Sequence, residues 1–268
     1  MPRLRGSRFG VRRDRGREEE GDAERQERQR IYYNVFDRDG RDRGDAARRG
    51  GTLAPDQKRQ YANELNEKKS SILSSLSAQD QDYDTFIDAY VVDARGEKVE
   101  GQDVFELLKD LQGAFDDGKF PVFEAKDGRV VIPVTGTGLW GPVWGYVALE
   151  KDMDTMAGII MAHKGETPGL GAEIATPKYQ ALFVGKKIFK GDEFVSVKLR
   201  KGGAQDPEHE VDAISGGTKT SDGVTAMLYN SLHHYLPLLE AKRKAAIEAI
   251  VFAPVREESN QENVENNE

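Results

Sequence analysis

The residues best suited to take part in a chemical reaction lie in the stretch Asp212–Ser221, which reads Asp-Ala-Ile-Ser-Gly-Gly-Thr-Lys-Thr-Ser. Within it, Thr218 offers a hydroxyl that follows two glycines, Gly216 and Gly217. Because glycine has no Cβ, a bulky phosphate-bearing group can approach this hydroxyl closely. The stretch therefore has the composition of a site where a phosphoester can be attached to the protein.

The residues after this threonine predict a helix. Ser221 and Asp222 are typical of a helix start, and an apolar-periodic run over 224–232 follows them. Backbone N–H groups and the helix dipole at such an end, together with Lys219, would stabilise the single negative charge of a phosphodiester on Thr218. The alternative is a plain turn followed by a helix cap, and spacing alone favours that alternative.

Three stretches of the chain resemble one protein family. Asp212–Thr218 resembles the flavinylation motif Asp-x-x-Ser/Thr-Gly-Ala-Thr of the FMN-carrying subunits of two bacterial membrane redox complexes. Gly138–Tyr146 (Gly-Leu-Trp-Gly-Pro-Val-Trp-Gly-Tyr) and His163–Glu173 (His-Lys-Gly-Glu-Thr-Pro-Gly-Leu-Gly-Ala-Glu) are similar to the C subunit of the sodium-translocating NADH:quinone oxidoreductase. The resemblance covers roughly residues 58–254. Gly217 departs from it, because the family usually has alanine there, but the exchange removes no reactive group.

The resemblance implies that FMN is covalently attached to Thr218. An ordinary hydroxyl is a weak nucleophile and no base partner is evident nearby, so a separate flavin transferase would load it from FAD with a magnesium ion. The subunit would then relay electrons from a membrane-embedded partner to a second subunit with covalent FMN, on the way to quinone. It would bind neither NADH nor quinone itself, in agreement with the lack of a dinucleotide-binding Gly-x-Gly-x-x-Gly unit.

The resemblance also implies which residues surround the flavin. A flavin ring needs an apolar slot and a few polar groups aimed at its edge. Leu170 would pack on the ring, and the glycines beside it would let main-chain N–H groups reach the ring. The predicted cofactor-binding set is Thr218, Ser215, Gly216, Gly217, Lys219, Thr220, His163, Glu166, Thr167, Gly169, Leu170, Gly171 and Trp140. The alternatives are a helix-leading turn for 166–171 and a core or interface position for Trp140 and Trp144.

Composition excludes several other classes of function. The chain has 268 residues and no cysteine, so disulfides, thiolate nucleophiles and Cys-ligated metal sites are excluded. Its four histidines show no metal-ligand spacing. Beyond residue 50, 36 acidic residues outnumber 24 basic ones, which argues against a nucleic-acid partner. We therefore predict no catalytic and no metal-binding residue. The expected partners are the other subunits of the redox complex and the flavin transferase.

Residues 1–54 differ in composition from the rest. The first 50 residues hold 15 arginines and no lysine, whereas lysine outnumbers arginine 18 to 6 beyond them. The family has a membrane helix in this place, but the chain contains no run of about eighteen apolar residues. We hypothesise that 36–49 is a frame-shifted translation of a lost membrane span, the alternative being an ordinary disordered tail. Either reading predicts an unstructured arm over 1–54.

The folded part is predicted to be a single FMN-binding domain over 55–254, followed by a disordered tail over 255–268. Short strands paired by hairpins, with helices in separate blocks, indicate an α+β fold built on antiparallel sheet. Hairpins are expected over 89–99, 120–134 and 144–162, helices over 55–76, 104–111, 176–184 and 221–251 with a break at Pro237, and a strand over 194–199. The family resemblance places this domain on the periplasmic face of the inner membrane.

Three other functions remain open on the sequence. The G subunit of the Rnf complex shares the Glu-Thr-Pro-Gly-Leu-Gly stretch, but the tryptophan-rich stretch favours the sodium-pump protein. A scaffold that never carries flavin is the non-redox alternative. A soluble flavoprotein without membrane attachment is the third.

Overall fold

The computed structural model of the chain describes residues 55–251. The predicted arm over 1–54 and the predicted tail over 255–268 lie outside these residues, as does the stretch 36–49 to which the frame-shift hypothesis applies. Within the described part, no helix is both long enough and apolar enough to span a membrane.

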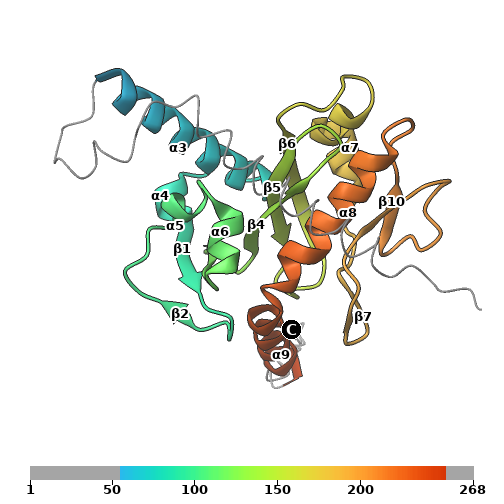
Figure 1. The fold of residues 1–268 in the computed structure, drawn as a ribbon. Coiled ribbons are helices and arrows are strands. Elements are labelled where there is room, and N and C mark those ends of the chain that lie inside the picture. The colour runs from blue at the N-terminus through green and yellow to red at the C-terminus, as the bar shows by residue number, and fades with distance from the viewer. Residues whose placement is uncertain (1–54, 252–268) are drawn as a thin grey trace, which may run out of the picture. The chain divides into compact units, whose positions relative to one another are not determined.

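A six-stranded sheet forms the centre of the fold (Figure 1), with strand order β2-β1-β3-β4-β5-β6 and every neighbouring pair antiparallel. The strands are β1 (Ile87–Val92), β2 (Lys98–Val99), β3 (Phe120–Ala125), β4 (Val130–Thr137), β5 (Pro142–Leu149) and β6 (Met156–His163). The three predicted hairpins are β1–β2, β3–β4 and β5–β6, so the antiparallel α+β architecture is confirmed. Gly128 takes the positive φ, 90°, that the β3–β4 turn requires.

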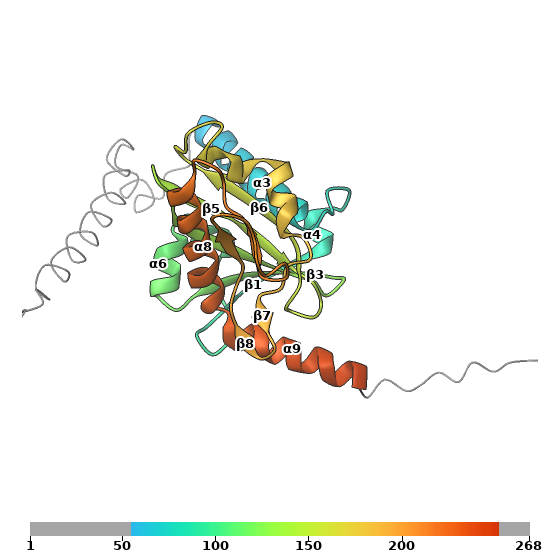
Figure 2. The same cartoon turned by 90° about the vertical axis from the view of Figure 1, so that its right-hand side faces the viewer.

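Helices cover both faces of this sheet (Figures 1 and 2). Because successive side chains of a strand point to opposite faces, β4 contributes to two hydrophobic clusters. Ile132 belongs to the cluster that contains α8 (Thr218–His233), whereas Val131 belongs to the cluster that contains the end of α3 (Pro55–Ser75). The sheet is therefore buried on both sides.

Shorter elements complete the described part of the chain. They are α4 (Tyr83–Phe86), α5 (Val104–Leu107), α6 (Leu111–Asp116), η1 (Gly171–Ala175), α7 (Pro177–Gln180), η2 (Ala181–Phe183), β7 (Phe189–Lys190), β8 (Glu193–Phe194), β9 (Lys198–Arg200), β10 (Glu210–Asp212) and α9 (Leu236–Val251). The single helix predicted over 104–111 is wrong, because Asp103 and Asp110 each cap the N-terminus of a separate short helix.

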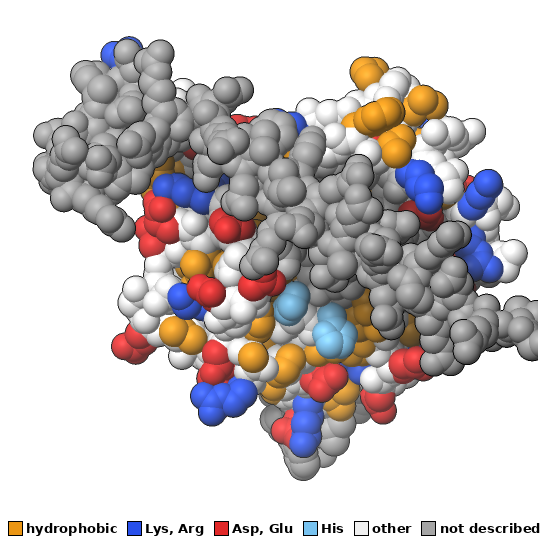
Figure 3. Space-filling view, viewed as in Figure 1, with side chains coloured by type: hydrophobic (Ala, Val, Ile, Leu, Met, Phe, Trp, Pro, Cys, Tyr) orange, Lys and Arg blue, Asp and Glu red, His pale blue; other side chains and the backbone are white. Residues whose placement is uncertain are grey.

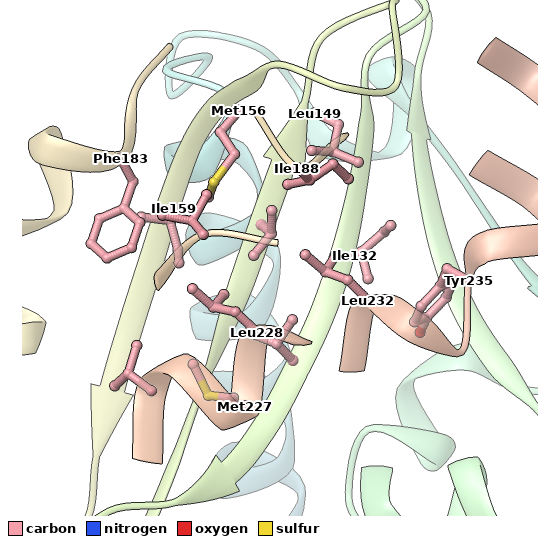
Figure 4. Packing of buried hydrophobic residues seen from close by; sticks show 14 of the residues in the cluster. Ile132, Leu149, Met156, Ile159, Phe183, Ile188, Met227, Leu228, Leu232 and Tyr235 are labelled. Carbon is pink, nitrogen blue, oxygen red and sulfur yellow. The ribbon is translucent and has the colours of Figure 1, made fainter. Parts of the chain in front are cut away.

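The core between α8 and the sheet fixes where α8 can lie. Met227, Leu228 and Leu232 are at most 1% exposed, and Figure 4 shows them among the side chains of the strands, near Ile132. Ser231 adds a polar contact, because its hydroxyl accepts from Thr135 N–H at 3.1 Å. α8 is thus held on the sheet by the same packing that stabilises the domain.

Two predicted boundaries of the terminal helices are wrong. The helix begins at Thr218 and not at Ser221, because Gly217 is its N-cap and the Ser221 side chain accepts a hydrogen bond from Ile214 N–H instead. The break between α8 and α9 falls at His234 and Tyr235 rather than at Pro237. Pro237 is the second residue of α9, in the first turn, where a missing N–H costs nothing.

The strand predicted over 194–199 is also wrong, because it is two strands in two different small sheets. β8 pairs with β7, whereas β9 pairs in parallel with β10. Between them, Ser196 adopts a positive φ of 58°, and the N–H groups of Val195 and Ser196 both donate to Ile188 C=O. A non-glycine residue in this conformation turns the chain and ends the first strand.

Truncation of a core residue of α8 should destabilise the whole domain. Leu228 is 0% exposed. We therefore expect Leu228→Ala to lower the free energy of unfolding by about 2–5 kcal/mol, because it removes buried methyl groups and leaves a cavity. Asn230→Ala, at an exposed position of the same helix, should change it by less than about 0.5 kcal/mol. Urea denaturation followed by circular dichroism measures both, and equal effects would contradict the described packing.

Stability should also depend on pH through Asp206. Its carboxylate contacts His209 Nδ1 at 3.1 Å and Lys190 Nζ at 3.2 Å, and the hydrogen bond with His209 lowers the pKa of Asp206 to about 2. A pKa below the unfolded value adds stability above a pH of about 4, which is lost as the pH falls toward 2. We expect Asp206→Asn to lower the urea midpoint at pH 7, and the difference from wild type to shrink below pH 4. A constant difference from pH 7 to 3 would refute the pairing.

Candidate functional site

The N-terminus of α8 presents Thr218 at the positive end of the helix. Gly216 has a φ of 73°, which turns the chain sharply into Gly217, the N-cap. The first N–H bond inside the helix runs from Ser221 to Gly217 C=O at 2.9 Å. The three preceding N–H groups, those of residues 218–220, therefore have no acceptor within the helix. The first turn contains no acidic residue that would offset the helix dipole.

The loop that leads to this helix is held by its backbone. Ser221 Oγ accepts from Ile214 N–H at 3.1 Å, and Gly217 N–H donates to Ile214 C=O at 3.0 Å. On the other side, the Tyr179 hydroxyl donates to Asp212 C=O at 2.8 Å. The loop 212–217 is therefore ordered by contacts of its own, with α8 and with α7.

A buried carboxylate joins this helix to two loops of the sheet. Glu166 is only 4% exposed. Its Oε2 accepts from the Thr220 hydroxyl at 2.5 Å, and its Oε1 accepts from Trp140 N–H at 2.9 Å. Its own N–H donates to His163 Nδ1 at 3.2 Å. One side chain thus links the first turn of α8, the turn between β4 and β5, and the loop after β6.

Glycines leave the space that these close contacts need. A Cβ on Gly138 or on Gly171 would lie 2.4 Å from an oxygen of the Glu166 carboxylate. A Cβ on Gly216 would lie 2.6 Å from Leu170 Cδ2, so the bend after β6 and the loop 212–217 touch. These separations are far shorter than an ordinary carbon contact, so no other residue fits without movement.

Gly217 is also tightly surrounded. A Cβ there would lie 2.9 Å from Ile214 Cγ2 and 3.4 Å from Gly171 N. The alanine that the resembled family usually has at this position would therefore require Ile214 to shift in this chain. Glycine at position 217, where the family usually has alanine, therefore agrees with the small space that the packing leaves there.

The structure brings all predicted site residues to one end of the sheet, in two layers. The inner layer, buried, contains Glu166, Gly171, Gly217 and Thr220. Thr218 and His163 are half-buried. The outer layer, exposed, contains Trp140, Thr167, Gly169, Leu170, Ser215, Gly216 and Lys219. The outer residues and Thr218 are accessible to a cofactor, whereas the oxygens of Glu166 and the hydroxyl of Thr220 are engaged with protein partners.

Large apolar side chains line the surface at this end. Trp140 is 62% exposed, Leu139 is 50% exposed and Leu170 is 41% exposed, so the core position considered for Trp140 is wrong. Trp144 is 40% exposed as well. Figure 3 shows a group of hydrophobic side chains over the end of the molecule where the loop after β6 lies in Figure 1. An apolar surface beside a cationic helix end suits a flat, partly apolar ligand that carries a phosphate.

Two contributors to the site were missed by the sequence prediction. Tyr179 lies 33 residues from Asp212, and no local pattern relates them. Ser221 was interpreted as a helix cap, whereas its hydroxyl supports the loop. Among the described residues, no group of three or more His, Cys, Asp or Glu side chains is arranged to hold a metal ion.

Comparisons with known proteins agree on one family. Residues 138–233 match the FMN-binding domain family. The C subunit of Na(+)-translocating NADH-quinone reductase from Neisseria meningitidis serogroup A is 34% identical over 224 residues, which cover 72% of this chain and 86% of that protein. The protein of the same name from Haemophilus ducreyi is 48% identical over 96 residues, which cover 36% of this chain and 37% of that protein.

Solved structures show the same similarity. The crystal structure of the C subunit of Na(+)-translocating NADH-quinone reductase from Parabacteroides distasonis has a TM-score of 0.63 and 41% identity, covering 71% of this chain and 98% of that chain. The crystal structure of NqrC from Shewanella oneidensis has a TM-score of 0.61. Its identity is 23%, with 68% of this chain and 99% of that chain covered, so it supports the fold alone.

The glycine at position 171 should be required for the buried carboxylate. In Gly171→Ala, the new Cβ would lie 2.4 Å from Glu166 Oε2 and 2.5 Å from Thr220 Oγ1. We expect a loss of about 1–3 kcal/mol in the free energy of unfolding, because the carboxylate must move. Gly165→Ala is the matched control in the same loop, since its Cβ would meet nothing nearer than Trp140 O at 3.8 Å. Chemical denaturation that ranks the two variants equally would contradict the close packing.

Proposed function

Because the chain belongs to the family of the Na(+)-translocating NADH-quinone reductase C subunits, we propose that it is the electron-relay flavoprotein of such a membrane complex and carries FMN esterified to Thr218. The match to the FMN-binding domain spans the tryptophan-rich turn, the loop after β6 and the start of α8. The observation that carries the proposal is the position of Thr218, half-buried at the N-terminus of α8 beside the bend that contains Leu170.

The residues around Thr218 fit a phosphodiester. The N–H groups of residues 218–220 have no acceptor within the helix, and Lys219 is exposed next to them. Helix N-termini with such N–H groups bind phosphate because the dipole and the donors both favour negative charge. A phosphodiester would bring one negative charge to this place, and the chain supplies donors and a cation for it.

The residues of the outer layer fit the rest of the cofactor. FMN supplies the capacity to accept and donate single electrons. Leu170 and Trp140 offer apolar surface for its ring, and Thr167 offers a hydroxyl at the same bend. Gly169, at a φ of 73° with open space around it, leaves the backbone of the bend accessible. In this site the residues of the protein would bind and orient the cofactor, and the flavin itself would transfer the electrons.

Attachment requires a second protein. A flavin transferase would catalyse attack of Thr218 Oγ1 on the FMN phosphorus of FAD, with magnesium, so that a new Oγ1–P bond forms, the bond to AMP breaks and the hydroxyl proton leaves. Among the described residues, no His, Lys, Asp or Glu side chain forms a hydrogen bond with the Thr218 hydroxyl, which supports a transferase that supplies the base. The chain would act as an acceptor and not as a catalyst of its own loading.

The remaining parts of the proposal concern the complex. The named relatives are one subunit each of a sodium-translocating NADH-quinone reductase. We propose that this chain likewise works beside other subunits, including one that holds a second covalent FMN, in the inner membrane with its domain on the periplasmic face. It would pass single electrons toward quinone. A tethered flavin suits this task, because it cannot dissociate between turnovers.

Mass spectrometry tests the cofactor and its attachment site. After co-expression with a flavin transferase, we expect the intact wild-type chain to carry one added FMN phosphoester and Thr218→Ala to carry none, because the other hydroxyls of the first turns of α8, those of Thr220 and Ser221, are buried against protein partners. Ser215→Ala is the matched control, since it removes an exposed hydroxyl of the same loop. It should keep the full adduct. A wild-type chain without FMN, or an adduct lost in Ser215→Ala and kept in Thr218→Ala, would refute the assignment.

A further inference from the structure

We propose that the buried pair Glu166–Thr220 is the positioning element of this site. The pair would hold Thr218, where the flavin is attached, at a fixed distance and orientation to the bend with Leu170, on which the flavin ring would pack. This inference rests on the proposed function, because it concerns a flavin tethered at Thr218. It assigns to Glu166 and Thr220 a role as positioning residues, which differs from contact with the cofactor.

The pair connects two segments that are distant in the sequence. Thr220 and Glu166 lie 54 residues apart, and their hydrogen bond of 2.5 Å is buried. Thr220 is 1% exposed and Glu166 is 4% exposed, so water cannot readily replace either partner. A buried carboxylate that loses a donor is costly, since hydrogen bonds to charged groups are about twice as strong as neutral ones. The pair is therefore strongly held in place.

On the helix side, the pair marks the inward face of the first turn of α8, and Thr218 lies on the other face. Successive residues of an α-helix are rotated by about 100°, so Thr218 and Thr220 project in nearly opposite directions. The Thr220 side chain lies inward against Glu166, so Thr218 lies on the outward side of the same turn. The half-buried state of Thr218 and the buried state of Thr220 agree with this arrangement.

On the loop side, the pair determines where Leu170 lies. The bend that starts after Glu166 is closed by two hydrogen bonds of 3.1 Å, from the N–H groups of Leu170 and Ala172 to Thr167 C=O. These two bonds hold the bend together, and Glu166 directly precedes it in the chain. A fixed Glu166 thus limits the positions open to Leu170, whose side chain lies against Gly216 of the loop 212–217.

The second oxygen of Glu166 extends the hold to the tryptophan turn. Trp140 N–H donates to Oε1 at 2.9 Å, and Gly138 N–H donates to Gly141 C=O at 2.8 Å across the same turn. All three segments that would surround the flavin are therefore tied to one carboxylate. If the tie to Thr220 is cut, α8 keeps its packing on the sheet, but the loops lose their fixed relation to Thr218.

The test compares Thr220→Val with Thr220→Ser. Valine has nearly the shape of threonine but donates no hydrogen bond, whereas serine keeps the hydroxyl. In the unloaded protein, we expect Thr220→Val to raise amide hydrogen exchange about ten- to a hundred-fold at the hydrogen-bonded N–H groups of 163–173. Thr220→Ser should exchange as wild type does. Thr220→Ala serves in the same way if the valine variant does not fold.

A control variant separates positioning from general destabilisation. Ser231→Ala removes another buried hydroxyl of α8, the one that accepts from Thr135 N–H at 3.1 Å. In the loaded protein, we expect the visible circular dichroism and the fluorescence anisotropy of the flavin to fall in Thr220→Val only. Thr220→Ser and Ser231→Ala should keep the wild-type signals.

The outcomes for the pair and for the proposed function differ. Wild-type exchange and wild-type flavin spectra in Thr220→Val, with FMN found on Thr218 by mass, would overturn the positioning role. Equal spectral changes in Ser231→Ala would overturn it too, because they would reveal general destabilisation. Absence of FMN from the wild-type chain would refute the proposed function instead, and the exchange comparison on the unloaded protein would still decide whether the pair ties the two segments.

Discussion

The burial of the Glu166 carboxylate is the constraint on which the arrangement of the site depends. A charged group removed from water is tolerated only where hydrogen-bond donors replace the lost hydration. Here Trp140 N–H and the Thr220 hydroxyl are those donors, and they come from different parts of the chain. The glycines at 138 and 171 follow from the same requirement, because any Cβ there would occupy the space of the carboxylate. One buried carboxylate thus constrains which residues can stand next to it in three segments of the chain.

The core holds the three segments in place, because each of them adjoins a strand or a helix that is packed in it. The tryptophan turn joins β4 to β5, the loop with Glu166 follows β6, and α8 packs through Met227 and Leu228 on the strands. The free energy that holds the site in place therefore comes mainly from buried apolar surface. The polar contacts add direction, since a hydrogen bond constrains geometry more than an apolar contact does.

The sequence predicted much of the frame and less of the site. Strand alternation and the Asp127–Gly128 turn are local signals, so the hairpins were predicted correctly. The family was predicted correctly from the resemblance of three short stretches of sequence. The start of α8 was misplaced because Ser221 has the local pattern of a cap, whereas its partner, Ile214, is set by the fold. The pairing of Glu166 with Thr220 was not predicted, because no sequence pattern encodes a contact across 54 residues. Both were instead expected to contact the cofactor.

The hydrogen-bond donors of Glu166 differ from those that a phosphodiester at Thr218 would use. Two negative charges near one helix end would compete if both used the free N–H groups of its first turn. Glu166 uses a side-chain hydroxyl of that turn and an N–H of another segment. The N–H groups of residues 218–220 are thereby left for the phosphate, and the exposed Lys219 adds a cation beside them. The carboxylate and a phosphate can therefore be stabilised side by side, because each has its own set of donors.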